Sequence, residues 1–230
     1  MPGFVDATCV SNNKISSTYQ DLVFEMPAGF NFMAGQYLTC RVSPDRLNSY
    51  SIAGKVGDSR LGLLVDTKPG GPGSKYFAAI KPGDKMPSLG PFGKFVLNLN
   101  DGAEELIFLG TGSGVAPLKA MIEAAFVQGV TKPMKLYFGL RHREDIFWND
   151  YFDRLQAEHN NFKFALCLSQ PDESWQGTSG HITDLVKADY KDLSHAAGYL
   201  CGGIKMIEEA REVLVELAMP ETRVYHEKFF

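Results

Sequence analysis

The first hundred residues carry their hydrophobic positions in short stretches, each followed by Pro, Gly or other turn-forming residues. The stretches cover residues 4–10, 19–25, 37–42, 61–66 and 95–99, and the turns between them include Pro27-Ala28-Gly29. Residues 74–80, directly after a run of glycines, are the one segment of this half expected to form a helix. Many short strands with frequent turns predict an antiparallel β-barrel, with a sandwich as the alternative.

The hydrophobic pattern changes after residue 102. A continuous apolar run at 106–110 is typical of a strand covered on both faces, and apolar residues with helical spacing follow at 118, 121, 122, 125 and 126. Further strands are expected at 134–139, 162–168, 197–201 and 223–229, and helices at 146–159, 181–187 and 204–219. This alternation predicts a parallel sheet with right-handed crossovers. We therefore expect a β-barrel domain over residues 1–101 and an α/β domain over residues 102–230.

Composition and charge exclude several classes of protein. The 230 residues have a formal net charge of −4, which argues against nucleic acid as a partner. No apolar run reaches the ~18 residues that a membrane-spanning helix needs, and no signal peptide is visible, so we expect a cytoplasmic protein without membrane insertion. The four cysteines, at 9, 40, 167 and 201, form no Cys-x-x-Cys pair. We therefore expect reduced thiols, no metal site and no iron–sulfur cluster.

A glycine-rich loop lies between the first strand and the first helix of the α/β half. It reads Gly110-Thr111-Gly112-Ser113-Gly114-Val115-Ala116-Pro117. Glycines at alternate positions let a ligand approach the backbone closely, and the proline suits the first turn of a helix. Because the N–H groups of a helix N-terminus bind anions, the loop indicates a nucleotide site. The alternative is a tight strand–helix turn that binds no ligand.

The glycine loop and the motifs around it resemble those of the ferredoxin–NADP reductase superfamily. The other motifs, in family order, are Ala34-Gly35-Gln36-Tyr37, Asn48-Ser49-Tyr50-Ser51, Gly71-Pro72-Gly73-Ser74, Gly90-Pro91-Phe92-Gly93, Tyr137-Phe138-Gly139-Leu140-Arg141, residues 166–172, Tyr199-Leu200-Cys201-Gly202-Gly203 and the C-terminal residues 225–230. Each motif is weak alone, but their order along nearly the whole chain is specific. The resemblance implies a FAD-binding barrel followed by an NAD(P)-binding α/β domain, with no attached iron–sulfur domain.

The resemblance assigns the flavin to residues of the barrel. Tyr50 would pack on the plane of the flavin ring, and the hydroxyl of Ser51 would face the flavin N5, where hydride arrives. The other flavin-binding residues that the resemblance implies are Arg46, Asn48, Ser49, Val65, Thr67, Gly71, Gly73 and Ser74. Ser74 is also expected as a helix N-cap, a role compatible with flavin binding. Asn48 stands where the family has an arginine, which leaves FAD and FMN open and makes Arg46 the alternative cation for the phosphates.

The resemblance also assigns residues to the nicotinamide dinucleotide. Cys201 would touch the nicotinamide and Glu227 would lie near the flavin edge, whereas a C-terminal aromatic residue, here Phe230, would cover the flavin. The remaining dinucleotide-binding residues would be Thr111, Gly112, Gly114, Val115, Ala116, Pro117, Arg141, Ser169, Gln170, Gly202 and Met206. Gln170 stands where NADPH-using relatives often have an arginine, so NADH is favoured over NADPH.

These residues together predict a flavin-dependent NAD(P)H oxidoreductase with Ser51, Cys201 and Glu227 at the catalytic centre. Hydride would pass between nicotinamide and FAD, and a separate protein such as ferredoxin, flavodoxin, an oxygenase or a cytochrome would accept or donate electrons. One alternative is an electron-transfer subunit of a multicomponent oxygenase or cytochrome system. The other is a nucleotide-binding module without redox turnover, in which Asn48 marks a lost flavin site.

Overall fold

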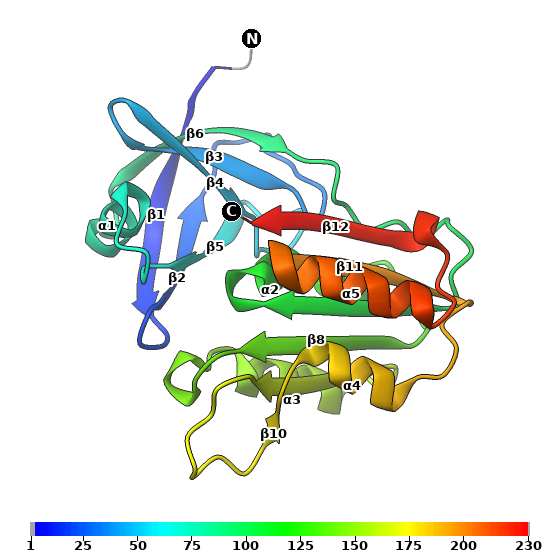
Figure 1. Ribbon diagram of the computed structural model, residues 1–230. Coiled ribbons are helices and arrows are strands. Elements are labelled where there is room, and N and C mark those ends of the chain that lie inside the picture. The colour runs from blue at the N-terminus through cyan, green and yellow to red at the C-terminus, as the bar shows by residue number, and fades with distance from the viewer. Residues whose placement is uncertain (1–2, 230) are drawn as a thin grey trace. The chain divides into compact units, whose positions relative to one another are not determined.

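The computed structural model describes residues 3–229; residues 1, 2 and 230 lie outside the described part, and the predicted role of Phe230 lies outside it too. The described chain divides into two compact units (Figure 1). The first contains the residues up to Leu97 together with Lys119–Gln128, and the second contains Asn98–Leu118 and the residues from Gly129 onward. The predicted boundary between residues 101 and 102 stays a prediction. No helix among residues 3–229 is long and apolar enough to cross a bilayer.

The first unit is a six-stranded antiparallel sheet in the order β4-β3-β6-β1-β2-β5. Its strands are β1 (Val5–Lys14), β2 (Tyr19–Glu25), β3 (Tyr37–Ser43), β4 (Arg46–Ser51), β5 (Arg60–Asp66) and β6 (Lys85–Phe92). A bridge between Ile52 and Leu63 joins the segment after β4 to β5, so the two ends of the sheet meet there. The predicted antiparallel barrel is confirmed.

The barrel is filled by side chains that alternate along the strands. Leu22 and Phe24 of β2 and Leu38 of β3 have no exposed surface. Helix α1 (Pro72–Ala79) adds Phe77, whose ring meets that of Phe24 edge-on at 6.4 Å. Burying side chains of this size stabilises the unit by roughly 1.5–3 kcal/mol each. The position of α1 against the core is therefore fixed by Phe77.

Three expectations for the barrel are wrong. Residues 95–99 form no strand, because this segment pairs with no other strand among the described residues. The hydrophobic pattern misses β4, which is mostly polar, and β6, which contains prolines and a glycine usually read as turn residues. Helix α1 begins at Pro72, two residues before the predicted start.

The second unit is a six-stranded parallel sheet in the order β10-β9-β8-β7-β11-β12, which confirms the predicted α/β class. Its strands are β7 (Glu105–Thr111), β8 (Met134–Leu140), β9 (Phe162–Leu168), β10 (Thr178–Ser179), β11 (Ala196–Gly203) and β12 (Val224–Phe229). The helices of the α/β half are α2 (Val115–Val127), α3 (Asn149–Glu158), α4 (Ile182–Asp189) and α5 (Ile204–Glu216). Helix α3 begins three residues later than predicted, because Trp148 has a left-handed backbone with φ of 54°.

Helices cover both faces of this sheet (Figure 1). Ile182 of α4 and Ile207 of α5 pack in one cluster with Tyr137 of β8. Phe152 of α3 instead contacts Phe138, the next residue of β8, with ring centroids 6.3 Å apart. Since neighbouring residues of a strand point to opposite faces, α4 and α5 lie on one face and α3 on the other.

Three stacked aromatic rings hold the start of the second unit in place. Tyr199 of β11 stacks on Phe108 of β7 at 5.3 Å and on Tyr225 of β12 at 5.0 Å. The hydroxyl of Tyr199 donates to the carbonyl of Asn98 at 2.9 Å and accepts its N–H at 3.0 Å. The hydroxyl of Tyr225 accepts from the Asn98 side chain and donates to Asp101, each at 3.0 Å. Residues 98–101 are thus bonded to the sheet before β7 begins.

The order of the strands creates a topological switch point in the second sheet, between β7 and β11, which we call the crossing point. From β7 the chain moves outward through β8 and β9, and it then returns to β11 on the other side of β7. In open α/β sheets the loops after two such diverging strands leave a crevice at the carboxyl ends of the strands, where ligands bind. Here these are the loop after β7, at residues 112–114, and the end of β11 at Gly203.

Candidate functional site

One face of β4 carries a row of three polar side chains. Arg46 donates from Nε to Asn48 Oδ1 at 3.3 Å, and Asn48 donates from Nδ2 to the Tyr50 hydroxyl at 3.3 Å. Residues two apart on a strand point to the same side, so the row follows from the spacing 46, 48, 50. Burial is the main cause of a raised pKa of Tyr50, which is therefore neutral at physiological pH. The row combines a cation, an amide and an aromatic ring.

The N-terminus of α1 meets this row. A Cβ atom added at Gly73 would lie 2.1 Å from the Tyr50 hydroxyl and 2.7 Å from Asn48 Nδ2, so any other residue would displace both side chains. Gly71 is the N-cap, and no side chain caps the helix. The backbone N–H groups of the first turn, except that of Pro72, are therefore available to an anion.

The expectation that Ser74 is the helix N-cap is wrong. Ser74 is the third residue of α1, and its hydroxyl donates to the carbonyl of Asp66 at 3.4 Å. That contact ties the helix to the end of β5. Ser74 is 8% exposed, so its hydroxyl belongs to the packing of the turn.

The other predicted flavin residues of the barrel lie in different settings. Ser49 faces away from the row on β4, and its hydroxyl lies 3.1 Å from that of Thr39 on β3. Val65 is buried in the barrel core. Thr67 follows β5, and both its N–H and its hydroxyl donate to the carbonyl of Thr18. Ser51 ends β4 and is 6% exposed.

A contact between Lys119 and the segment after β4 was not predicted from the sequence. Lys119 of α2 donates from Nζ to the carbonyl of Ala53 at 3.1 Å and pairs with Glu123 Oε1 at 2.7 Å. The side chains of Lys119 and Glu123 are only 15% and 19% exposed. The pair therefore holds the segment that follows Ser51, two residues further along. Its only sequence signal is a Lys–Glu spacing of four on a helix.

In the second unit, the glycine loop packs directly on the end of β11. A Cβ atom at Gly114 would lie 2.2 Å from the carbonyl oxygen of Cys201, and one at Gly202 would lie 2.2 Å from the Thr111 hydroxyl and 2.7 Å from Met206 Cε. Gly202 also has φ of 153°, within the range that favours glycine. The two glycines therefore allow the loop after β7 and the end of β11 to meet at the crossing point.

Helix α2 starts immediately after this loop. Val115, Ala116 and Pro117 form its first turn and are buried, so any contact that they make with a dinucleotide uses the backbone or the edge of the turn. Gly112 has φ of 55°, which turns the chain out of β7. The loop has the geometry of an anion site at the start of a helix.

Cys201 is fully buried near the carboxyl end of β11, opposite Glu227 of the edge strand β12. Burial, and after it the charge of Glu227, raises the pKa of the Cys201 thiol well above its ordinary value. The thiol is therefore neutral at physiological pH, and a neutral thiol is a poor nucleophile. Cys201 can contact a ligand as a small apolar group.

The ends of β8 and β9 are joined by several hydrogen bonds. The N–H of Gln170 donates to the carbonyl of Arg141 at 2.9 Å, and Nδ1 of His142 lies 2.9 Å from the carbonyl of Gln170. Ser169 donates its N–H to the carbonyl of Leu140. The structure thus brings Arg141, Ser169 and Gln170 together. His142 was not predicted, and its only sequence signal is its place between two arginines.

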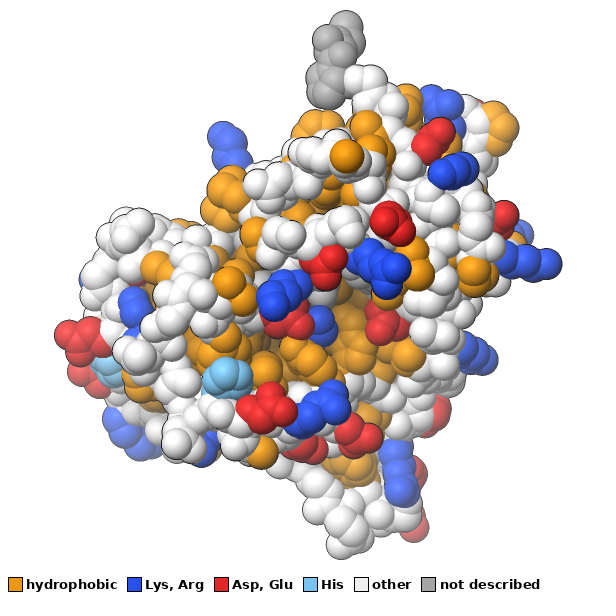
Figure 2. Space-filling model, turned by 180° about the vertical axis from the view of Figure 1, so that it is seen from behind, with side chains coloured by type: hydrophobic (Ala, Val, Ile, Leu, Met, Phe, Trp, Pro, Cys, Tyr) orange, Lys and Arg blue, Asp and Glu red, His pale blue; other side chains and the backbone are white. Residues whose placement is uncertain are grey.

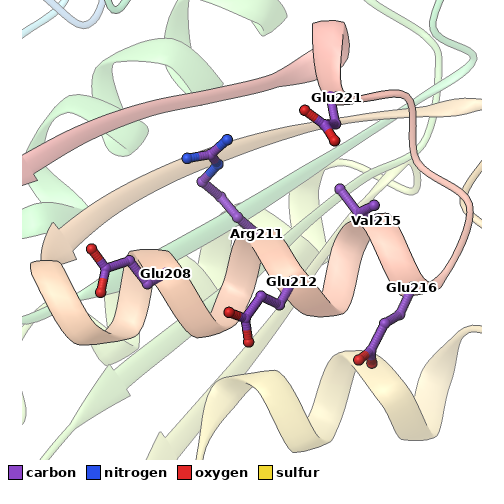
Figure 3. Close-up of a pocket in the computed structure, with 6 residues that line it drawn as sticks. All are labelled: Glu208, Arg211, Glu212, Val215, Glu216 and Glu221. Carbon is purple, nitrogen blue, oxygen red and sulfur yellow. The ribbon is translucent and has the colours of Figure 1, made fainter.

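One surface groove does not fit a dinucleotide. It has a volume of about 520 Å³ and lies along α5 and the turn before β12 (Figure 3). Its lining consists of Glu208, Arg211, Glu212, Val215, Glu216 and Glu221. Four carboxylates against one guanidinium repel phosphate groups. On the face shown in Figure 2, acidic and basic side chains are interspersed, without a field of one sign.

Comparisons with known proteins agree with two cofactor sites. The family model described as Oxidoreductase FAD-binding domain matches residues 6–97, and that described as Oxidoreductase NAD-binding domain matches residues 108–212. Ferredoxin–NADP reductase B of Sorangium cellulosum is 31% identical over 97% of this chain and 97% of its own length. The chain belongs to the ferredoxin–NADP reductase superfamily. As a member of this superfamily it is an NAD(P)H-dependent flavin oxidoreductase that binds FAD and a nicotinamide dinucleotide.

Some of the similar proteins are longer than this chain. The ferredoxin–NAD(P)(+) reductase component of the naphthalene 1,2-dioxygenase system of Pseudomonas putida is 28% identical over 87% of this chain, which spans 61% of that protein. The crystal structure of the Amycolatopsis reductase GcoB has a TM-score of 0.91 and 27% identity, with 98% of this chain and 69% of that chain covered. In this chain the matched part comprises the barrel and the α/β unit. No group of three or more His, Cys, Asp or Glu residues among residues 3–229 could hold a metal ion.

The residues present fit the two cofactors of the superfamily. The uncapped N-terminus of α1, with Arg46 and Asn48 beside it, suits the phosphates of a flavin nucleotide, and Tyr50 supplies an aromatic ring. The glycine loop and the end of β11 suit a dinucleotide at the crossing point.

Proposed function

We propose that this protein transfers hydride between NADH and FAD and exchanges the electrons with a separate protein such as ferredoxin. The observation that carries the proposal is the contact of Gly73, at the uncapped start of α1, with Asn48 and Tyr50 of β4. This contact places a helix N-terminus, an amide and an aromatic ring within one small site. Such a combination suits a flavin nucleotide, which has both an anionic phosphate group and a planar ring.

Each residue of the barrel site has a distinct role in this proposal. Tyr50 packs on the flavin ring, and Ser51 donates a hydrogen bond at the flavin N5. The N–H groups of Gly73 and Ser74, with Asn48 and Arg46, bind the phosphates. Ser49, Val65, Thr67 and Gly71 contribute backbone groups. FAD, when bound, supplies the hydride-accepting ring.

The α/β residues bind and orient the dinucleotide in this proposal. Thr111, Gly112 and Gly114 offer backbone N–H groups at the start of α2. Cys201, Gly202 and Met206 bound the nicotinamide at the end of β11, and Val115, Ala116 and Pro117 hold the loop in place. Glu227 lies beside Cys201 in the sheet and orders the polar end of the nicotinamide site. Alignment of the two rings supplies most of the rate, since it replaces a bimolecular encounter.

We propose NADH as the preferred dinucleotide, since Gln170 carries no charge and Ser169 beside it is neutral. Arg141 and Arg143, which follow β8, are the alternative cations for a 2′-phosphate. Phe230 as a cover of the flavin and a cytoplasmic location remain predictions from the sequence.

A second candidate is the reductase component of a multicomponent oxygenase. The Pseudomonas putida relative carries that description, whereas the Sorangium cellulosum relative is described as a ferredoxin–NADP reductase. The third, a nucleotide-binding module without turnover, requires that Asn48 abolishes flavin binding.

Two measurements test the proposal. Titration of the flavin-free protein with FAD and FMN, followed by fluorescence quenching, should give a Kd below about 10 µM for FAD, or roughly −7 kcal/mol. Anaerobic addition of NADH should then bleach the flavin absorbance, and oxidised ferredoxin, flavodoxin and cytochrome c are compared as electron acceptors. Failure of both flavins to bind would leave only the nucleotide-binding module. Bleaching without electron transfer to any of the three added proteins would contradict the proposed exchange of electrons with such a partner.

A further inference from the structure

The loop between β9 and β10, drawn in yellow in Figure 1, connects a cation to an anion through a serine. Arg143, in the turn after β8, donates from Nη1 to the hydroxyl of Ser174 at 3.0 Å. The Ser174 hydroxyl donates in turn to Oδ1 of Asp172, which also accepts the Ser174 backbone N–H at 2.8 Å. We call Arg143, Ser174 and Asp172 the relay.

The carboxylate of the relay is ionised. Hydrogen bonds from Ser174 lower the pKa of Asp172, and the charge of Arg143 lowers it further. The positive charge of Arg143 is therefore partly compensated at neutral pH. A guanidinium held in this way has fewer free N–H groups for another anion.

The relay is attached to the ends of two neighbouring parallel strands. Gln170, two residues before Asp172, is bonded to Arg141 and His142 at the end of β8. Both ends lie at the carboxyl edge of the sheet, the edge that also carries the glycine loop. At this edge of an α/β sheet, acidic residues favour a free ribose hydroxyl and arginines favour a ribose phosphate.

We infer that Asp172 is a specificity-determining residue that disfavours dinucleotides with a 2′-phosphate, by holding Arg143 through Ser174. This inference rests on the proposed function, because it requires the adenosine end of the dinucleotide to bind at β8 and β9. It deepens the preference for NADH by naming a residue beyond Gln170. Asp172 acts on the reaction only through binding.

The experiment compares D172N with E173Q. Both remove one negative charge from the same exposed loop, but Glu173 is outside the relay. Calorimetry measures the affinities of 2′,5′-ADP and 5′-ADP, and steady-state kinetics measures kcat/KM for NADPH and NADH. D172N should raise the preference for the 2′-phosphate about three- to tenfold in both assays, as a partly exposed charge-assisted contact allows. E173Q should leave the ratio within about twofold of wild type.

A double variant identifies the released cation. R143Q in the D172N background should remove the gain, whereas R143Q alone should change the ratio little, because Arg143 is held by Ser174 in the wild type. Equal effects of D172N and E173Q would overturn the inference and leave only the net charge of the loop. A gain in D172N that R143Q does not remove, and R141Q does, would overturn the relay in favour of Arg141.

The measurements distinguish a failure of Asp172 as a specificity-determining residue from a failure of the proposed dinucleotide site. If wild type and D172N bind 5′-ADP but show the same ratio for the two ADP isomers, the inference fails and the proposed function stands. If neither ADP isomer nor NADH binds, the proposed dinucleotide site itself fails.

Discussion

Replacing Gly73 by alanine tests whether the α1 N-terminus and β4 form one flavin site. The added Cβ would lie 2.1 Å from the Tyr50 hydroxyl, whereas real Cβ contacts below 3.0 Å are essentially absent, so the hydroxyl has to retreat by about 1 Å. Asn48 Nδ2, at 2.7 Å, has to move as well. The movement tilts the Tyr50 ring away from its edge contact with Phe77, now 4.7 Å between centroids.

The expected loss of FAD affinity follows from the displacement of the Tyr50 ring. Misplacing an aromatic stacking partner costs about 0.5–1.5 kcal/mol, so the FAD dissociation constant should rise about two- to tenfold. The thermal stability of the flavin-free protein should change little, because alanine in place of glycine favours a helix by up to about 1 kcal/mol and offsets part of the strain. Flavin titration by fluorescence and a melting curve of the flavin-free protein measure the two quantities.

Gly71→Ala is the matched control. Gly71 lies at the same helix start, has negative φ, and has no atom within 4 Å of an added Cβ. This variant should bind FAD like wild type. If G73A and G71A bind FAD equally well, the contact of Gly73 with Tyr50 plays no part in flavin binding, and the geometric argument for the site is refuted.

Three further predictions address the remaining sites. Gly114→Ala should abolish dinucleotide binding and destabilise the protein by about 1–3 kcal/mol, because its Cβ would meet the rigid Cys201 backbone at 2.2 Å; near-normal NADH binding would contradict this. Arg46→Gln should weaken the binding of FAD about ten- to a hundredfold if the charge of Arg46 reaches the phosphates. Arg41 lies on the neighbouring strand with its side chain over the Phe4 ring, so Arg41→Gln should leave FAD binding unchanged. Equal effects of the two variants would show that only the overall charge of the protein matters. Burial raises the pKa of the Cys40 thiol to about 12 and raises that of Cys201 as well, so the thiolates form only well above pH 8. A thiol reagent at pH 8 should therefore label the native protein slowly, whereas all four cysteines should react after denaturation.

The two fold classes could be predicted from the spacing of the hydrophobic residues and from the turn-forming residues between them. The strands and helices of the α/β half follow from apolar runs that alternate with helical spacing, and β8, β9 and β11 all lie where that pattern puts them. The pattern fails where side chains face a site rather than a core. Strand β4 is polar because Asn48 and Tyr50 face the start of α1 rather than only the core. Strand β6 remains a strand although Pro87 and Gly90 interrupt it.

Contacts between side chains that are distant along the chain could not be predicted from the sequence. The place of Arg46 could be anticipated, because residues two apart on a strand share a face. Nothing in the spacing links Arg143 to Ser174, 31 positions later, since that contact depends on the register of β8 with β9. Ser74 shows the converse: a residue typical of a cap takes another role because the helix starts earlier, at Pro72.

The stacked tyrosines determine where this chain can be divided. A fragment that starts at residue 102 would lose Asn98 and Asp101, and the hydroxyls of Tyr199 and Tyr225 would lose the partners described above. A buried polar group without a partner costs about 1–3 kcal/mol, which is a large share of the stability of a domain of this size. The nucleotide-binding half is therefore better produced on its own from residue 98 than from residue 102, since the longer fragment keeps these hydrogen bonds.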